Sequence, residues 1–362
     1  MRYRIDSITN YQLTINKLKT KKYFLIFAIF ISIAAGCGKA DERLQKKFVP
    51  YWELYQKGAY EEAVAGFLKL EKKYPKTPFT AKVKVTRANA YKKLNNSAEA
   101  EKIYLEVAKN FPENKYIDEA WYGLGEIYKE QKKWNEASDY FNRVINTFPD
   151  KPSSKNAEKS LDEINFYLFF HPDPSQGKKH TIRRGDNLQN IAIKNNMTPG
   201  LLAKVNGIKD IKYLSVDQDI IIPKINLKLK VDLSDRSLIL FNNDKRVKKY
   251  LIAIGADDSR TPTGKFVINQ KLVNPTWYFE GKVYQPNTPE NRLGTRWMGI
   301  SAKGYGIHGT NDESIIGQNI TNGCIRMHNA DAEELYDIVS EEIKNEESGI
   351  VLFKGTEVEI TE

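Results

Sequence analysis

Hydrophobic positions along this chain follow two different patterns. Residues 45–165 are rich in helix formers, with aromatic residues at the spacing of helical turns. From Leu227 to Leu233, and again from Leu238 to Leu240, apolar residues alternate with polar ones, which is typical of strands with one buried face. The pattern therefore predicts a multidomain chain of the α+β class, with a helical N-terminal part and a β-rich C-terminal part.

The helical part contains an internal repeat with a strict period of 37 residues. Each copy has a small residue suited to a helix crossing, an aromatic one turn later, and an aromatic–proline pair suited to a helix end. The repeated positions are Ala63, Ala100 and Ala137; Phe67, Tyr104 and Phe141; Leu54, Tyr91 and Tyr128; and Tyr74-Pro75, Phe111-Pro112 and Phe148-Pro149. Residues 45–165 thus resemble tetratricopeptide repeats, which implies stacked helix–turn–helix units. Binding of a protein partner and a purely structural spacer both remain open.

Residues 166–224 predict a linker followed by a small module. Residues 166–178 are expected to be the linker, because the stretch from His171 to Lys179 holds two prolines and several turn formers. Residues 179–224 then predict a β-α-α-β unit. Its features are a strand containing His180, a turn at Gly185-Asp186, a helix with Leu188, Ile191 and Ala192 inward, a helix with Leu201, Leu202 and Val205 that stops at Asn206-Gly207, and a strand ending at Pro223. These segments are similar to a LysM module, which implies binding to peptidoglycan glycan strands, with His180 in a structural role.

Residues 225–362 predict a β-rich domain with one helix near its end. Asn242-Asn243-Asp244 supplies a tight turn, and Val247–Ile254 forms the next strand. Ala332, Leu335, Tyr336 and Val339 fall on one helical face, and Asn329 is the expected N-cap of that helix. Strands carrying Val351 and Phe353, then Val358 and Ile360, close the chain.

Residues 1–36 have the composition of an export signal. Six basic residues and one acidic residue give this segment +5 of the chain's net charge of +10, and they precede an apolar run of 13 residues from Tyr23 to Ala35. This run is too short for a transmembrane helix, which needs about 20 apolar residues. Ala34-Ala35-Gly36-Cys37 resembles a bacterial lipobox, which implies a lipoprotein signal peptide and lipidation at Cys37. An uncleaved anchor and a soluble secreted form are the alternatives.

The rest of the chain is mildly basic and carries no arginine-rich strip interleaved with aromatics, so nucleic-acid binding is not indicated. A mildly basic surface suits anionic wall polymers or lipid. We therefore expect a membrane-anchored lipoprotein of the cell envelope that faces the periplasm or the wall.

Cys324 is the second of only two cysteines in the chain. With lipid on Cys37 it has no disulfide partner within the chain, and a lone thiol in an exported protein points to reactivity. It lies sixteen residues after His308, whose imidazole is suited to activate a thiol near neutral pH. Gly323 permits a sharp turn before a nucleophile, and the N–H groups of Gly323 and Cys324 are candidates for an oxyanion hole.

His308-Gly-Thr310 and Gly323-Cys-Ile-Arg326 are similar to the signature of L,D-transpeptidase catalytic domains of the YkuD type. Further blocks in the family's order are Thr261–Phe266, Asn274–Trp277, Leu293–Trp297 and Gly355–Val358. The resemblance implies that Cys324 is the nucleophile and His308 the general base, with the imidazole oriented by the carbonyl of Gly309. It implies an oxyanion hole at Gly323 and Cys324, no metal and no cofactor. The residues it places near the donor stem peptide are Arg326, Thr310, Thr321 and Asn322, of which Asn322 stands where many members have a second histidine.

The implied reaction is acyl transfer from a tetrapeptide stem, with release of D-Ala and formation of a 3→3 cross-link in peptidoglycan. An L,D-carboxypeptidase or another hydrolase on the same fold is one alternative, and a non-catalytic peptidoglycan-binding scaffold is another. Cys324 as a buried structural thiol, and a zinc site at His308, Cys324 and His328, are the remaining alternatives.

Overall fold

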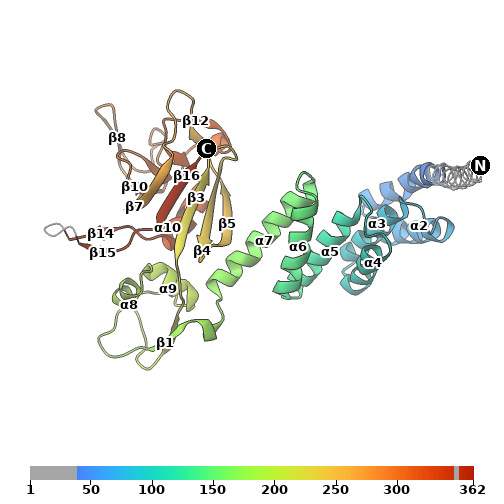
Figure 1. Ribbon diagram of the computed structural model, residues 1–362, viewed down its shortest axis with the longest axis horizontal. Coiled ribbons are helices and arrows are strands. Elements are labelled where there is room, and N and C mark those ends of the chain that lie inside the picture. The colour runs from blue at the N-terminus through green and yellow to red at the C-terminus, as the bar shows by residue number, and fades with distance from the viewer. Residues whose placement is uncertain (1–38, 346–349) are drawn as a thin grey trace, which may run out of the picture. The chain divides into compact units, whose positions relative to one another are not determined.

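The computed structural model describes residues 39–345 and 350–362, so the expected signal peptide (1–36) and Cys37 lie outside the described residues. The chain divides into two compact units, Met1–Leu161 and Asp162–Glu362 (Figure 1). Within the described ranges, none of the helices combines the length and apolar character needed to cross a membrane.

The first unit is built from helical pairs with the period seen in the sequence. Residues 39–56 are helical, and the helices that follow are α2 (Tyr60–Lys73), α3 (Thr80–Lys93), α4 (Ser97–Asn110), α5 (Ile117–Glu130), α6 (Trp134–Thr147) and α7 (Pro152–Phe170). The residues that cap α2, α4 and α6 at their C-termini are Tyr74, Phe111 and Phe148, the aromatics of the repeated aromatic–proline pairs. The 37-residue period therefore sets where each of these helices ends.

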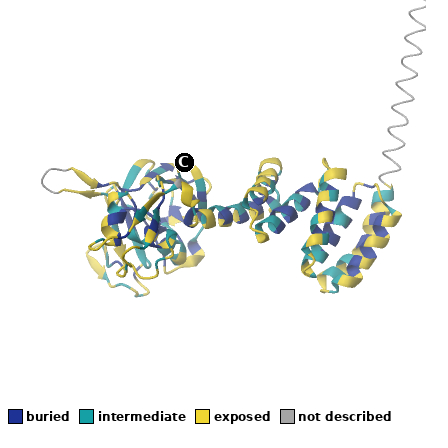
Figure 2. Ribbon diagram, turned by 90° about the horizontal axis from the view of Figure 1, so that it is seen from below, coloured by how far each residue is buried: buried dark blue, intermediate teal, exposed yellow. Residues whose placement is uncertain are grey.

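Small and aromatic residues alternate in the cores of the repeats. The alanines of the repeat and the aromatics one turn later are completely buried: Ala63, Ala100, Ala137, Phe67, Tyr104 and Phe141. Gly123 of α5 faces the ring of Tyr104, where a Cβ atom would lie 2.4 Å from Cζ. Figure 2 shows buried residues recurring along each of these helices. The unit thus has the stacked cores of a tetratricopeptide-type array.

The second unit begins with the end of α7 and a β-α-α-β module. The module consists of β1 (Lys178–Thr181), α8 (Leu188–Lys194), α9 (Pro199–Val205) and β2 (Asp219–Ile222), with β1 and β2 antiparallel. Side chains of Asn187 and Thr198 accept hydrogen bonds from the first turns of α8 and α9. His180 Nε2 lies 2.9 Å from Asp186 Oδ2 across the first turn of the module, which is a structural contact.

The linker expected at residues 166–178 is partly wrong, because α7 continues to Phe170 and a short 3₁₀ helix, η1, covers Pro174–Gln176. Phe169 and Phe170 are buried in the core of the second unit. Asp162 forms a two-point ion pair with Arg246, with both N–O distances 2.7 Å. Packing of these aromatics therefore extends the helix to the residue before the proline-containing stretch that begins at His171.

A mixed eight-stranded sheet forms the C-terminal domain of the described chain, in the order β13-β11-β10-β7-β16-β3-β4-β5. Its strands are β3 (Leu227–Asp232), β4 (Ser237–Asn242), β5 (Lys245–Leu251), β7 (Gly264–Val273), β10 (Arg296–Ile300), β11 (Gly306–His308), β13 (Ile325–Arg326) and β16 (Glu357–Thr361). Ala253, just beyond β5, exchanges two backbone hydrogen bonds with Arg326 of β13. The two edges of the sheet are thereby joined, which fixes the backbone of Arg326.

Smaller elements surround this sheet. They are β6 (Ile254–Gly255) paired with β12 (Asn319–Thr321), the hairpin of β8 (Trp277–Phe279) and β9 (Lys282–Tyr284), the 3₁₀ helix η2 (Glu313–Ile315), the helix α10 (Asn329–Ile338), and β14 (Ile343–Lys344) paired with β15 (Val351–Phe353). Asn243 and Asp244 adopt positive φ angles of 49° and 60° between β4 and β5, as the expected tight turn requires.

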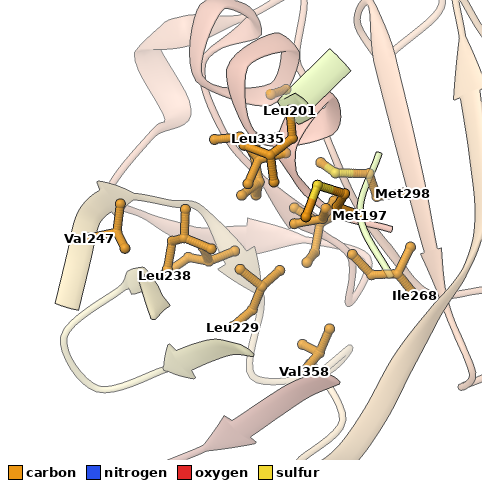
Figure 3. Packing of buried hydrophobic residues seen from close by; sticks show 14 of the residues in the cluster. Met197, Leu201, Leu229, Leu238, Val247, Ile268, Met298, Leu335 and Val358 are labelled. Atoms are coloured by element: carbon orange, nitrogen blue, oxygen red, sulfur yellow. The ribbon is translucent and has the colours of Figure 1, made fainter. Parts of the chain in front are cut away.

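One hydrophobic core connects the β-α-α-β module to the sheet domain. Met197 and Leu201 of the module lie beside Leu335 of α10 and Met298 of β10 (Figure 3). Thr198 Oγ1 donates a hydrogen bond of 2.6 Å to the carbonyl of Asp337. The module is therefore packed against the sheet domain through a shared core.

Candidate active site

Cys324 sits in a tight turn between β12 and β13. The turn is held by Thr321, whose hydroxyl donates to the carbonyl of Cys324 at 2.6 Å and accepts from the N–H of Gly323 at 3.2 Å. Gly323 has a φ angle of +98°, and a Cβ atom there would lie 2.6 Å from the ring of Tyr305. Glycine is needed at this position both for the backbone conformation and for the close packing.

The thiol of Cys324 is free and half-buried. Its Sγ atom lies 3.8 Å from the carbonyl oxygen of Gly304. Burial raises the pKa of the thiol above its ordinary value, while a backbone hydrogen bond from Gly306 and the charge of Arg326 act in the opposite direction. Because burial outweighs these two effects, the resting group is a neutral thiol at neutral pH.

His308 ends β11 beside the strand that follows Cys324. The register of β11 and β13 pairs His308 with Arg326, and the N–H of Met327 donates to the carbonyl of His308 at 3.0 Å. The imidazole is 1% exposed, and its Nδ1 atom lies 2.7 Å from the carbonyl oxygen of Gly309. Nδ1 therefore carries the proton, and Nε2 is the basic nitrogen.

Burial lowers the pKa of His308 to about 3, and the positive charge of Arg326 adds to this effect. Backbone hydrogen bonds with Gly309 and Leu293 act in the opposite direction. The site at rest is therefore a neutral thiol with a neutral imidazole rather than a preformed ion pair.

Trp297 covers one face of the imidazole. The two rings stack with centroids 5.5 Å apart and planes inclined by 27°. The indole is held by a hydrogen bond of 3.0 Å from Nε1 to the side-chain oxygen of Gln270, its neighbour on β7. The stacked indole keeps water from one face of the His308 ring and contributes to the burial of His308.

Asn329 holds the segment that follows His308, and the expectation that it caps α10 is wrong. The N-cap position is His328, and the Asn329 side chain reaches back across the site. Its Oδ1 accepts from the N–H groups of Thr295 and Thr310 at 3.2 Å each, and its Nδ2 donates to the carbonyl of Thr310 at 2.7 Å. A Cβ atom at Gly309 would lie 2.1 Å from Oδ1, and one at Gly294 would lie 2.3 Å from it. Both glycines therefore make room for this amide.

A cavity of about 450 Å³ opens over these residues. It is lined by His308, Cys324, Arg326 and Asn322 among the expected site residues. Its other walls include Trp277 and Tyr278 of the β8–β9 hairpin, Trp297, and Arg292. Trp277 stacks on both Phe279 and Tyr284, with ring centroids 4.9 and 4.8 Å away.

Thr310 and Thr321 do not line this cavity, so their roles are structural, in place of the predicted contact with substrate. Both are buried, with exposed fractions of 0% and 1%. Thr310 uses its hydroxyl within its own loop, where it exchanges hydrogen bonds with the backbone of Asp312, and Thr321 fixes the cysteine turn. Asn329, Trp297 and Arg292 are the site residues that the sequence did not identify.

The zinc alternative finds no support in the arrangement of these side chains. His328 Nδ1 lies 3.5 Å from Glu313 Oε2, and both side chains are exposed. Within residues 39–345 and 350–362, no group of three or more histidine, cysteine or acidic side chains is placed to hold a metal ion.

Three family models match consecutive parts of the chain. The L,D-transpeptidase catalytic domain (YkuD) matches residues 227–360, the LysM domain matches residues 180–223, and an outer membrane lipoprotein family (YfiO) matches residues 52–169. The resemblances seen in the sequence and the multidomain fold class are thereby confirmed.

Individual relatives agree with the catalytic-domain match. The putative L,D-transpeptidase YkuD of Bacillus licheniformis is 37% identical over 166 residues, which cover 44% of this chain and 92% of the relative. The protein of the same name in Bacillus subtilis is 33% identical with the same coverage. Putative L,D-transpeptidase YqjB of Bacillus subtilis is 40% identical over 111 residues, or 29% of this chain and 61% of the relative. Because these matches extend over nearly the full length of two such relatives, the chain belongs to the L,D-transpeptidase family.

Proposed function

We propose that this protein cross-links peptidoglycan by acyl transfer through Cys324. The observation that supports this most directly is the joint position of Cys324, His308 and Arg326 on the wall of one cavity. The donor is a tetrapeptide stem, and the sulfur attacks the carbonyl between its third residue and the terminal D-Ala.

In the first step, Nε2 of His308 takes the thiol proton as the S–C bond forms. The imidazole is suited to this because it is neutral at rest and its Nδ1–H is held by the carbonyl of Gly309. The tetrahedral intermediate then collapses, the C–N bond to D-Ala breaks, and the proton on Nε2 passes to the leaving amine. A thioester on Cys324 remains.

The developing oxyanion needs N–H donors near the sulfur. We assign the main donor to the N–H of Cys324, because the N–H of Gly323 is already bonded to the hydroxyl of Thr321 at 3.2 Å. Gly323 contributes chiefly through the backbone turn that its positive φ angle permits.

In the second step, an amine of another stem attacks the thioester. The N–C bond forms, the C–S bond breaks, and His308 transfers the amine proton to the departing thiolate. The product is a 3→3 cross-link. Water in place of the amine gives a shortened tripeptide stem, which is L,D-carboxypeptidase activity.

The other domains support a location in the cell envelope. The LysM module is proposed to bind glycan strands, and its packing against the sheet domain fixes its orientation relative to the active site. The repeat unit offers cavities of about 920 and 580 Å³, which supports binding of a protein partner. Lipidation of Cys37 would anchor the chain to a membrane.

The test is product analysis by mass spectrometry. Purified disaccharide-tetrapeptide is incubated with the protein and, in parallel, with a Cys324→Ala variant. A dimer that depends on Cys324 and forms with loss of D-Ala supports the transpeptidase. A tripeptide product without dimer would indicate a carboxypeptidase. If a folded protein forms neither product, a non-catalytic scaffold is favoured.

A further inference from the structure

One end of the repeat unit carries a concentrated set of exposed cations. The helix of residues 39–56 contributes some of them, and the segment around the end of α2 contributes the others. These residues, which we call the basic face, are Lys39, Arg43, Lys46, Lys47, Lys69, Lys72, Lys73 and Lys76. Within each helix they recur three or four residues apart, so they lie on one side of that helix.

The two segments of the basic face meet in the folded unit. Phe48 packs on Phe67 of α2 and on Phe79, with ring centroids 5.4 and 5.3 Å apart. Asp41 Oδ1 accepts a hydrogen bond of 2.6 Å from the N–H of Phe79, three residues after Lys76. The start of the first described helix therefore lies against the turn between α2 and α3, and the eight cations share that end of the unit.

The protein does not neutralise these charges. Within the described residues, none of the eight cations forms an ion pair with a carboxylate. The same two stretches hold three acidic residues, and two of these are engaged elsewhere: Asp41 as described above, and Glu71 in ion pairs with Arg87 and Lys84. The third, Glu42, is exposed. The basic face therefore has a clear excess of positive charge available to an external partner.

Neither the fold nor the helix dipole requires these lysines. Lys72 and Lys73 lie in the last turn of α2, where cations favour the helix dipole, but Lys69 and Lys76 lie outside that turn. In the second repeat the four corresponding positions hold Glu106, Lys109, Asn110 and Glu113, and in the third they hold Arg143, Asn146, Thr147 and Asp150. The run of lysines is thus confined to the first repeat, which is the one nearest Cys37 in the sequence.

We propose that the basic face binds the phosphate headgroups of anionic lipids in the membrane that carries the anchor. Cys37 precedes Lys39 by two residues, which span at most about 7 Å. The Debye length at physiological ionic strength is about 8 Å, so a lipid on Cys37 brings this end of the unit within electrostatic range of the bilayer.

The attraction comes from the charges of the folded unit. Each cation close to an anionic leaflet tightens binding about fivefold, so several of them together bind measurably without any acyl chain. Because this attraction needs no lipid on Cys37, it is separate from the proposed anchor and adds to it. Its effect is to hold the first repeat against the headgroups rather than leave it free on its tether.

Sedimentation with vesicles tests the proposal on the expected mature chain, residues 37–362, with Cys37→Ser to prevent lipidation. This parent keeps every described residue, and far-ultraviolet circular dichroism checks its helices and those of each variant. Vesicles of equimolar phosphatidylcholine and phosphatidylglycerol are compared with vesicles of phosphatidylcholine alone.

Two variants of the parent each lose four exposed charges of the repeat unit. The face variant changes four positions of the basic face outside the last turn of α2: Lys46→Gln, Lys47→Gln, Lys69→Gln and Lys76→Gln. The matched control changes four exposed lysines elsewhere in the unit: Lys57→Gln, Lys93→Gln, Lys102→Gln and Lys132→Gln. Both variants have the same net charge, so a difference between them reports position.

We expect the parent to bind the phosphatidylglycerol vesicles at least about tenfold more tightly than the phosphatidylcholine vesicles. The face variant should lose about tenfold or more of its affinity for phosphatidylglycerol, and the matched control should stay within about twofold of the parent. Equal losses in the two variants, or a parent without preference for phosphatidylglycerol, would overturn the proposal.

Two further measurements separate this proposal from its neighbours. Binding to purified sacculi that depends on the same four lysines, without binding to vesicles, would overturn the proposal and identify an anionic wall polymer as the partner. Intact mass of the native protein extracted from membranes reports the lipid on Cys37. Its absence beside vesicle binding by the parent would count against the anchor but not against the basic face.

Discussion

The indole of Trp297 stacks on the imidazole of His308 at a centroid distance of 5.5 Å. The hydrogen bond from Trp297 to Gln270 fixes the indole, and the stack shields the imidazole from water. Burial is the largest cause of the low pKa of His308, which lies near about 3. Trp297 is therefore a positioning residue that keeps the imidazole of His308 unprotonated at acidic pH, as the proposed role of His308 as general base requires.

Replacement of Trp297 by leucine should make acylation sensitive to mild acid. With water at the ring, the pKa of His308 rises toward its ordinary value of about 6.5, so the base becomes protonated at about pH 5. We expect the ratio of the acylation rate at pH 5 to that at pH 7 to fall about three- to tenfold relative to the parent protein. Intact-mass measurement of Cys324 acylation by a carbapenem over this pH range gives the rates.

Trp277→Leu is the matched control, because Trp277 lines the same cavity but stacks on Phe279 and Tyr284. Its pH profile should follow that of the parent. If the Trp297→Leu profile also followed the parent, burial by the indole would not be the reason for the low pKa of His308.

The thiol of Cys324 should react slowly with alkylating agents at neutral pH. Burial raises its pKa, so the thiolate fraction is small at pH 7 and grows about tenfold per pH unit until the pH passes the raised pKa. Arg326→Gln should slow alkylation further, because the charge of Arg326 lowers this pKa. Iodoacetamide labelling followed by intact mass gives the profile, and a plateau reached below pH 7 would mean a stabilised thiolate instead.

Much of the fold follows from local sequence signals. Three copies of an aromatic–proline pair, 37 residues apart, predicted the ends of α2, α4 and α6, because proline cannot continue a helix and disfavours the helical conformation of the residue before it. The turn before Cys324 was also predictable, since a sharp turn favours glycine, and Gly323 has a positive φ angle.

Other features depend on contacts between distant segments. Asn329 has the sequence position of an N-cap, but its amide bonds Thr295 and Thr310, which lie 34 and 19 residues away. Phe169 and Phe170 continue α7 into the predicted linker, because both side chains pack in a core formed by later residues. The position of Trp297 on the cavity wall likewise depends on how β7, β10 and β11 pair.

The LysM module and the sheet domain should unfold together. Leu201 of α9 and Leu335 of α10 are both completely buried in one core, so a cavity at Leu201 weakens both sides of the contact. Leu201→Ala should destabilise both domains by about 2–5 kcal/mol. Hydrogen exchange measured by mass spectrometry on peptides from α8 and from β10 gives the two free energies of opening.

Ile211→Ala provides the control, since Ile211 lies in the same module with 50% of its surface exposed. It should change both free energies by less than about 0.5 kcal/mol. A loss confined to α8 in Leu201→Ala would mean that the module opens independently of the sheet domain.

In the repeat unit, Arg87 of α3 and Glu71 of α2 form a buried two-point ion pair. The Nε–Oε1 and Nη2–Oε2 distances are 2.6 and 2.9 Å, and both residues are less than a tenth exposed. Arg87→Leu leaves the carboxylate of Glu71 buried with Lys84 as its other cation, 2.9 Å away. Because Lys84 offsets part of the lost charge, we expect Arg87→Leu to lower the free energy of unfolding by about 3 kcal/mol. This value is at the low end of the range for a broken buried ion pair.

Glu71→Gln combined with Arg87→Leu should be less destabilising than Arg87→Leu alone, because no unpaired charge is left in the core. Lys102→Ala is the control for an exposed pair, since Lys102 lies 3.8 Å from Glu99 and is 78% exposed, and it should cost less than about 0.5 kcal/mol. Urea unfolding followed by far-ultraviolet circular dichroism measures all three, since most helices of the described chain belong to the repeats. A double variant less stable than Arg87→Leu would mean that the pair stabilises the repeats through packing rather than by matching a buried charge.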